Sequence, residues 1–234
     1  MVTGGAGGIG SAAAHWFASR DASVAIADLP GALGAATWPS SAIAVEIDIH
    51  DERSVAAAFR AVECKLGAPS IVVNAAGITG SGSVENMSLT EWQRVIEVNL
   101  TGAFLVGREA IPWMRALGRG KLVYLSSVNA RTGGNELSGA AYAAAKSAIE
   151  ALTRHLARHL APVIQVNAVA PGPVQTAMLS RLSAADLDHL VAAIPAGRCA
   201  TAGEIAETIG FLCSPGASYI TGVTVDQNGG QWLG

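Results

Sequence analysis

The alternation of two kinds of segment constrains the fold of this 234-residue chain most strongly. Short runs rich in β-branched residues alternate with Ala-rich segments that have helical periodicity. This alternation is typical of a parallel sheet whose two faces are both covered by helices. We therefore expect an α/β protein built on one doubly wound, mostly parallel sheet.

The same pattern predicts where the strands and helices lie. The expected strands are Ser23–Asp28, Ala42–Ile47, Ser70–Asn74, Lys121–Ser126, Val163–Ala168 and Val223–Asp226. The expected helices are Ile9–Arg20, Glu52–Leu66, Leu89–Met114, Ala141–Leu160, Ala184–Ile194 and Gly203–Leu212. Capping-box patterns mark the starts of three helices, at Ser88–Glu91, Ser183–Asp186 and Thr201–Glu204.

The predicted helix Leu89–Met114 is apolar over more than one face, so we expect it to pack on the sheet and on a neighbouring subunit. Gly102, Gly107 and Pro112 predict an irregularity within it.

Composition limits the classes of partner. Charged residues make up 14% of the chain and apolar residues 50%, against about 25% charged in an average protein. We infer that other subunits cover much of the surface, in a homo-oligomer. The net charge of −3 provides no basic field for nucleic acid or anionic lipid. We expect neither nucleic-acid nor membrane partners.

The cysteines and histidines predict no metal centre. Cys64, Cys199 and Cys213 lie far apart and form no Cys-x-x-Cys pair, which fits a reducing cytoplasm better than a disulfide framework or a zinc site. His155 and His159 lie four residues apart, but the glutamate of a zinc-protease helix is missing between them. With no signal peptide and no apolar stretch of membrane-spanning length, we expect a soluble cytoplasmic protein.

The glycine run Thr3–Gly10 predicts a dinucleotide site. Gly4, Gly8 and Gly10 allow the backbone to turn tightly and approach a pyrophosphate, and the helix that begins at Ile9 presents its amide-rich N-terminus to this anion. The first strand of such a unit needs about five residues before the glycine turn, whereas only Met1 and Val2 precede Thr3. We expect a truncated first strand in a single domain over residues 1–234, and additional N-terminal residues in the natural polypeptide, which intact-mass analysis of native protein would reveal.

Asp28 predicts the choice of cofactor. It ends the second strand about twenty residues after the turn, where a carboxylate accepts hydrogen bonds from the adenosine ribose and repels a 2′-phosphate. No Lys or Arg lies in the glycine loop or directly after Asp28 to neutralise such a phosphate. The sequence therefore favours NAD over NADP. The alternative for Asp28 is a turn cap at the strand end. Asp48 fits either an adenine contact or the N-terminal charge of the next helix.

Downstream, Tyr142 and Lys146 are spaced to share one helix face, so that the ammonium can stabilise a phenolate. The serine pair Ser126–Ser127 precedes them at the end of a predicted strand.

In this order, the motifs resemble those of the short-chain dehydrogenase/reductase family across essentially the whole chain. Thr3-Gly4-x-x-x-Gly8-x-Gly10 resembles its cofactor loop, Asp48-Ile49 its adenine contact, and Asn74-Ala75-Ala76-Gly77 its post-strand turn. The catalytic tetrad matches Asn99, Ser127, Tyr142 and Lys146, and the nicotinamide-side segment matches Pro171, Gly172, Val174 and Thr176. The resemblance implies a seven-stranded doubly wound Rossmann sheet and, commonly, a tetramer.

The resemblance also implies residue roles. Tyr142 would be the general acid/base, Ser127 would hydrogen-bond the reacting oxygen, and Asn99 would anchor a water chain. Lys146 would hold the nicotinamide ribose and stabilise the phenolate. For Tyr142 to act as a base at neutral pH, its pKa must fall by about three units, which corresponds to ~4 kcal/mol of preferential stabilisation of the phenolate. No metal is required.

Three departures from the family pattern stand out. Ala75 replaces the second Asn of the turn. The interval from Ser127 to Tyr142 is two residues longer than the family's commonest spacing, and counting back by that spacing ends at Asn129. Because Ser127 directly follows the predicted strand Lys121–Ser126, an enlarged loop is the favoured explanation. Gln227-Asn228 interrupts the usual Val-Asp-Gly-Gly ending, and the sequence offers no functional account of this pair.

By the same resemblance, two segments are expected to determine which substrate binds. They are the loop 129–139 and a lid that begins at Met178 and Leu179 and extends to Arg198. Polar residues of the loop fit a hydroxylated or carboxylated substrate, but Arg131 and Glu136 fit equally well as a pair with each other or with solvent. We expect an NAD-dependent dehydrogenase that interconverts a secondary alcohol and a ketone. The alternatives are an NADPH-dependent 3-oxoacyl-thioester reductase and an NAD-sensing regulator without turnover.

Overall fold

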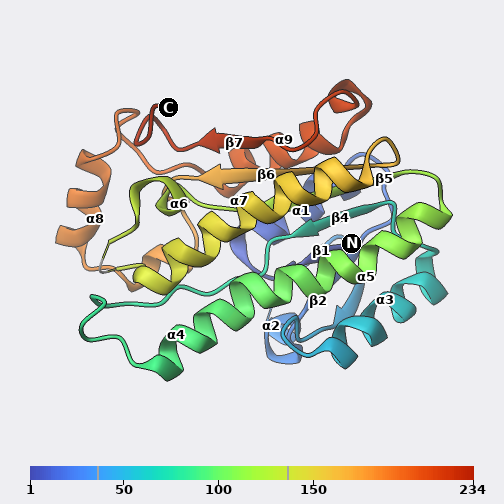
Figure 1. The fold of residues 1–234 in the computed structure, drawn as a ribbon, viewed down its shortest axis with the longest axis horizontal. Coiled ribbons are helices and arrows are strands. Elements are labelled where there is room, and N and C mark those ends of the chain that lie inside the picture. Colours follow the sequence, from blue (N-terminus) through green and yellow to red (C-terminus); the bar gives the residue numbers. More distant parts are fainter. Residues whose placement is uncertain (36, 136) are drawn as a thin grey trace.

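The computed structural model of the chain describes residues 1–35, 37–135 and 137–234 (Figure 1). Its sheet has the strand order β3-β2-β1-β4-β5-β6-β7, and every neighbouring pair is parallel. The strands are β1 (Val2–Thr3), β2 (Ala25–Asp28), β3 (Ile43–Glu46), β4 (Ile71–Asn74), β5 (Gly120–Leu125), β6 (Ile164–Pro171) and β7 (Thr224–Gln227). The prediction of a doubly wound parallel sheet with seven strands is confirmed.

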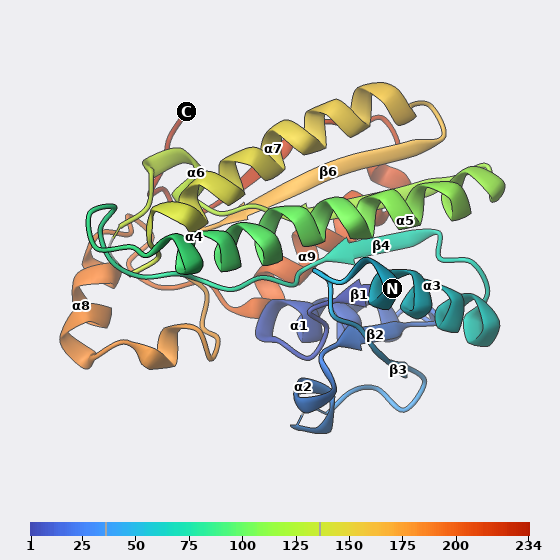
Figure 2. The same cartoon turned by 60° about the horizontal axis from the view of Figure 1, so that its bottom comes forward.

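Helices cover both faces of the sheet. One layer contains α3 (Glu52–Leu66), α5 (Gly102–Ala116) and α7 (Ala140–Leu160), and the other contains α1 (Gly8–Ala18), α2 (Pro30–Ala35) and α9 (Ala202–Cys213). Figure 2 shows α1, α2 and α9 on the side of the sheet away from α5 and α7. Among the described residues, no helix is long and apolar enough to cross a membrane.

Successive strand residues enter opposite cores, because side chains of a strand alternate between its faces. On β5, Leu122 and Tyr124 pack in the α3–α5–α7 core, whereas Val123 and Leu125 pack in the α1–α9 core. All four side chains are buried. Burying each aliphatic side chain contributes roughly 1.5–3 kcal/mol. This two-sided burial explains why the strands read as continuous apolar runs.

The predicted single helix Leu89–Met114 is divided in the structure. It consists of α4 (Leu89–Ile96), a π-helical segment η1 (Glu97–Thr101) and α5. The irregularity therefore lies before Gly102, Gly107 and Pro112, not at them. The two glycines allow close packing instead: a Cβ on Gly102 would lie 2.8 Å from Ile49, and one on Gly107 would lie 2.1 Å from the Tyr124 hydroxyl.

Shorter elements complete the chain. They are α6 (Asn129–Thr132), η2 (Leu179–Arg181), α8 (Ala184–Ala192) and η3 (Pro215–Ala217). Helices α2 and α6 were not predicted, and β6 extends to Pro171 rather than ending at Ala168. The reciprocal capping box forms at Thr201–Glu204, while the Ser88 and Ser183 hydroxyls accept from the third helical N–H.

Candidate active site

The carboxyl ends of the strands open into one cavity of about 1340 Å³. Parallel strands bring these ends to one edge of the sheet, where ligands bind in folds of this type. The sequence-predicted residues that line the cavity are Gly4, Gly8, Ile9, Gly10, Asp28, Asp48, Ile49, Gly77, Ser127, Tyr142, Lys146, Pro171, Gly172, Val174 and Thr176. Asn74 and Asn99 lie behind its wall.

The glycine loop has no room for side chains. Gly4 has a φ of 65°, and a Cβ there would lie 2.5 Å from the Ala76 nitrogen. A Cβ on Gly10 would lie 2.1 Å from the Gly4 carbonyl oxygen, and one on Gly8 would lie 2.4 Å from Thr176 Cγ2. The backbone and the N-terminus of α1 are thus left bare toward the cavity, which fits a pyrophosphate.

Asn74 supports this loop from below. The buried Thr3 hydroxyl donates a hydrogen bond of 2.5 Å to Asn74 Oδ1, which ties the end of β1 to the end of β4. Asn74 therefore fixes the position of the turn and does not line the cavity.

Asp28 faces the cavity with its carboxylate already oriented. The Ala6 N–H donates to Oδ2 (3.0 Å) and the Leu29 N–H donates to Oδ1 (2.8 Å). Among the described lining residues, the Lys and Arg side chains are Lys146 of α7, whose ammonium donates to the carbonyl of Leu125 at the end of β5, and Arg94, which makes two 2.8 Å hydrogen bonds to Glu91. Neither belongs to the segments around Asp28, so no described lysine or arginine there offsets its charge. The carboxylate keeps lone pairs with which it can accept further hydrogen bonds in the cavity.

Asp48 lines the cavity next to Ile49. Its Oδ1 lies 2.6 Å from Nδ1 of His50, another lining residue. The N-terminal cap of α3 is Asp51, which accepts from the Arg53 N–H. The Asp48 N–H donates to the Ser54 hydroxyl of α3 (2.8 Å), so Asp48 lies both at the cavity and beside the start of α3, and both interpretations of Asp48 stay open.

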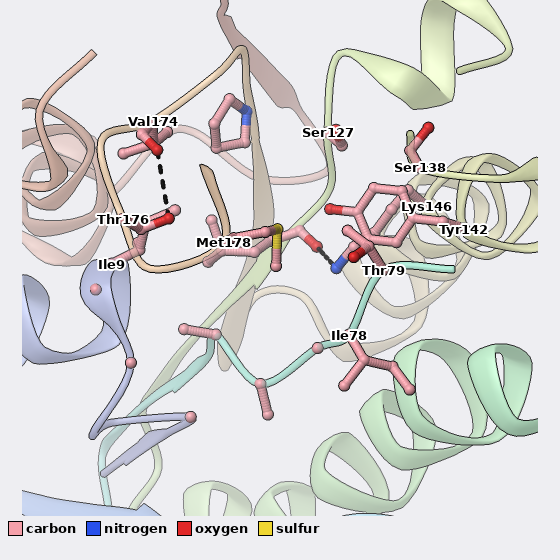
Figure 3. Close-up of a pocket in the computed structure, with 18 of the residues that line it drawn as sticks. Ile9, Ile78, Thr79, Ser127, Ser138, Tyr142, Lys146, Val174, Thr176 and Met178 are labelled. Atoms are coloured by element: carbon pink, nitrogen blue, oxygen red, sulfur yellow. Dashed lines mark hydrogen bonds between the residues drawn. The ribbon is translucent and has the colours of Figure 1, made fainter. Parts of the chain in front are cut away.

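Ser127, Tyr142 and Lys146 converge at the other end of the cavity. Figure 3 shows the Tyr142 hydroxyl directed into the cavity, with Ser127, Ser138 and Lys146 around it. Ser127 lies near the Tyr142 phenol and acts to lower its pKa, and the Ser127 hydroxyl accepts a hydrogen bond from the Asn129 N–H (3.2 Å). Lys146 Nζ donates to the Leu125 carbonyl (2.8 Å) and lies 5.5 Å from the centre of the Tyr142 ring. The enlarged loop therefore still brings Ser127 to the phenol.

Burial shifts the pKa of both titratable side chains of this group in the chain alone. Burial raises the pKa of Tyr142 above its ordinary value, and the hydrogen bond with Ser127 opposes that rise. Burial also lowers the pKa of Lys146 to about 8. The fall expected for Tyr142 does not occur in the chain alone, because desolvating a phenolate outweighs the hydrogen bond.

Asn99 lies in the π-helical segment and is 1% exposed. Its Nδ2 donates to the carbonyls of Ile78 (2.8 Å) and Val95 (2.9 Å). Its Oδ1 has no hydrogen-bond partner among the described residues. This oxygen points at Gly77, where a Cβ would lie 2.7 Å from it and 3.5 Å from Lys146 Nζ. The unused acceptor is thus directed toward the lysine end of the cavity.

Comparison with known proteins agrees with this arrangement. A family model described as enoyl-(acyl carrier protein) reductase matches residues 4–231. A crystal structure titled short-chain dehydrogenase/reductase, glucose/ribitol dehydrogenase, from Brucella melitensis superimposes with a TM-score of 0.90 at 32% identity, over 100% of this chain and 96% of that one. The chain belongs to the short-chain dehydrogenase/reductase family.

Two curated relatives of this short-chain dehydrogenase/reductase differ in named activity. The 3-oxoacyl-(acyl-carrier-protein) reductase FabG of Pseudomonas aeruginosa is 37% identical, over 100% of this chain and 96% of the relative. The 2-dehydro-3-deoxy-L-rhamnonate dehydrogenase (NAD(+)) of Sphingomonas sp. is 34% identical, over 99% of this chain and 94% of the relative.

The structure also shows what Gln227 and Asn228 do in this short-chain dehydrogenase/reductase. Gln227 accepts from the Gly172 N–H (3.0 Å) through its carbonyl and donates to the Glu204 carbonyl (2.8 Å) through its side chain. Asn228 is buried, and its Cα would lie 2.9 Å from a Cβ on Gly172. The pair therefore holds the segment that follows β6 in place.

The substrate side contains residues that sequence reasoning did not assign. Arg131 forms ion pairs with Glu150 and Asp226, whereas Glu136 lies outside the described residues. Apolar side chains of the lid segment line the cavity, namely Met178, Leu179, Leu182, Leu190 and Ala193. Ser138 and His50 line it as well. One sequence signal was available for His50, namely its position two residues after Asp48, whose carboxylate it contacts in the structure.

Proposed function

We propose that this short-chain dehydrogenase/reductase is an NAD-dependent enzyme that interconverts a secondary alcohol and a ketone. One observation carries the proposal: a bare glycine loop, the Asp28 carboxylate and the Ser127–Tyr142–Lys146 group all line a single cavity. When bound, the nicotinamide cofactor supplies the acceptor or donor of hydride. The residues fit it, since any side chain at Gly4, Gly8 or Gly10 would overlap a neighbour.

Different residues of the chain would bind the cofactor and transfer the proton. Asp28 would bind the adenosine ribose, and the N-terminus of α1 would bind the pyrophosphate, as the contacts described above support. Gly172, Val174 and Thr176 would flank the nicotinamide side, and Asp48, Ile49 and Gly77 would line the adenosine half.

Tyr142 would hold the transferred proton at its phenol oxygen. Its raised pKa keeps the phenol protonated at neutral pH in the chain alone, which suits protonation of a ketone oxygen. Oxidation of an alcohol requires the phenolate, which Lys146 in its ammonium form stabilises. The Ser127 hydroxyl would donate to the reacting oxygen and orient it toward Tyr142. Asn99, through its free Oδ1, would accept from the water that leads the proton outward.

Replacing Tyr142 with Phe tests the reaction. The proposal expects turnover of a secondary alcohol or ketone to fall by a factor of about 100 or more, with NADH binding changed by less than about twofold. A Tyr219→Phe variant is the matched control, because Tyr219 is fully exposed. Undiminished turnover in Tyr142→Phe would overturn the assignment.

The second candidate is an NADPH-dependent reductase of 3-oxoacyl thioesters. It is supported by the similarity to FabG and by the description of the matching family model. Asp28 opposes it, because a carboxylate that binds the adenosine ribose would repel a 2′-phosphate. The similarity to an NAD(+)-dependent dehydrogenase supports the first candidate.

A further inference from the structure

A partly buried ion pair joins Glu150, on α7 one turn beyond Lys146, to Arg131 on α6. The Glu150 side chain is 5% exposed. Its Oε1 accepts from the Ser126 hydroxyl (3.0 Å), and its Oε2 accepts from Nη1 of Arg131 (2.6 Å). On its other side the Arg131 guanidinium reaches Asp226 of β7, at 3.3 Å and 3.5 Å. The network therefore joins α6, α7, β7 and Ser126, the residue that follows β5.

Such a network is a poor source of net stability. The free energy needed to desolvate a carboxylate and a guanidinium offsets much of the free energy gained from their attraction. Apolar side chains of similar volume often stabilise a fold just as much. What the pair provides is a defined geometry, because the Arg131 Nη1 donor fixes one carboxylate oxygen of Glu150 and the Ser126 hydroxyl fixes the other.

The network encloses the residues on either side of Ser127. The Ser126 hydroxyl, which contacts Glu150, also lies 3.1 Å from the Lys146 carbonyl. Arg131 is in α6, which begins two residues after Ser127. A second contact joins the same two helices, since the Ser147 hydroxyl donates to the Ala130 carbonyl (3.0 Å). The segment containing Ser127 is thus attached to α7 before and after that serine.

We propose that Glu150 and Arg131 are positioning residues that hold Ser127 against Tyr142. This rests on the proposed function, in which Ser127 and Tyr142 act on one substrate oxygen. It also explains how a loop two residues longer than the family's commonest spacing keeps its serine in register, because its first turn is attached to α7 by Arg131. Arg131 is then committed to Glu150 and Asp226 and does not bind a substrate carboxylate.

The test uses the full chain with three variants. Arg131→Met/Glu150→Gln removes both charges together, so that no unpaired carboxylate is left buried. Arg131→Lys keeps the positive charge but loses the planar guanidinium, whose separate nitrogens bind Glu150 and Asp226. Arg108→Met is the matched control, an exposed arginine paired with Glu52 on a distant face.

We expect kcat of the double variant to fall by about tenfold or more, which corresponds to ~1.4 kcal/mol in the barrier. The Kd for NADH should change by less than about twofold, because the network does not touch the glycine loop. Arg131→Lys should lie between the double variant and the wild type, and Arg108→Met should match the wild type. A loss of structure alone would weaken NADH binding in parallel with kcat.

A second readout does not depend on turnover. Phenolate absorbance is titrated in each variant, with the same variant carrying Tyr142→Phe subtracted. Since the Ser127 hydrogen bond lowers the pKa of Tyr142, the double variant should show a pKa about half a unit higher or more. Should wild-type protein turn over no alcohol or ketone, the proposed function fails while this titration still decides the positioning role. An unchanged Tyr142 titration overturns the inference, as does a kcat within about twofold of wild type.

Discussion

Replacing Lys146 with Met should abolish turnover and yet stabilise the protein near neutral pH. Burial lowers the pKa of Lys146 from 10.5 to about 8. The shift of about 2.5 units corresponds to ~3.4 kcal/mol of penalty for the buried cation. Met removes that penalty and also the hydrogen bond to the Leu125 carbonyl, worth about 1 kcal/mol. The expected gain in unfolding free energy is therefore about 2 kcal/mol at pH 7.

The sign of this effect determines its pH dependence. The folded state of the wild type binds fewer protons at Lys146 than the unfolded state between pH 8 and 10.5. Wild-type stability from this group therefore rises with pH through that window. By pH 9.5 roughly 2 kcal/mol of the penalty is gone, so that Lys146→Met and wild type should be about equally stable.

Urea unfolding followed by tryptophan fluorescence, at one protein concentration and at both pH values, measures the difference. Lys65→Met, at an exposed position of α3, is the control and should show no such pH-dependent gain. If Lys146→Met is destabilised equally at pH 7 and pH 9.5, the lysine is not held as a desolvated cation, and the reasoning is refuted.

Two further substitutions test the cofactor loop and the π-helical segment. Gly10→Ala places a Cβ 2.1 Å from the Gly4 carbonyl and should weaken NADH binding by about tenfold or more by isothermal titration, whereas Gly34→Ala, with open space around it, should leave binding unchanged. Asn99→Ala removes two hydrogen bonds to carbonyls and should cost roughly 1–3 kcal/mol in unfolding free energy, together with a lower kcat at unchanged NADH affinity. Asn86→Ala, which loses only an exposed contact to Ser83, should do neither, and equal effects of the two asparagine variants would contradict the role of Asn99.

Local patterns predicted the frame of the molecule well. Strand positions followed from apolar runs, because both faces of a parallel sheet are buried and each strand on this chain alternates between two cores. The glycine loop and Asp28 were predictable since their roles depend on backbone space and on position at a strand end.

Features set by long-range contacts were not predictable. The π-helical turn Glu97–Thr101 has an ordinary helical composition, and its distinguishing contact, from Asn99 to the Ile78 carbonyl, joins residues far apart in the sequence. The attachment of Arg131 to Glu150 and Asp226 likewise depends on how α6, α7 and β7 meet. The sequence showed the charged neighbour of Tyr142 but not the degree of burial that raises its pKa in the chain alone, so the fall that catalysis requires stays a prediction for the enzyme with bound cofactor.

A parallel titration of purified protein with NADH and NADPH tests the central claim most directly. The assignment of Asp28 as the ribose ligand predicts that NADH binds tighter by about tenfold or more, a difference of ~1.4 kcal/mol or more. Equal or tighter binding of NADPH would contradict it and make the 3-oxoacyl-thioester reductase the leading function.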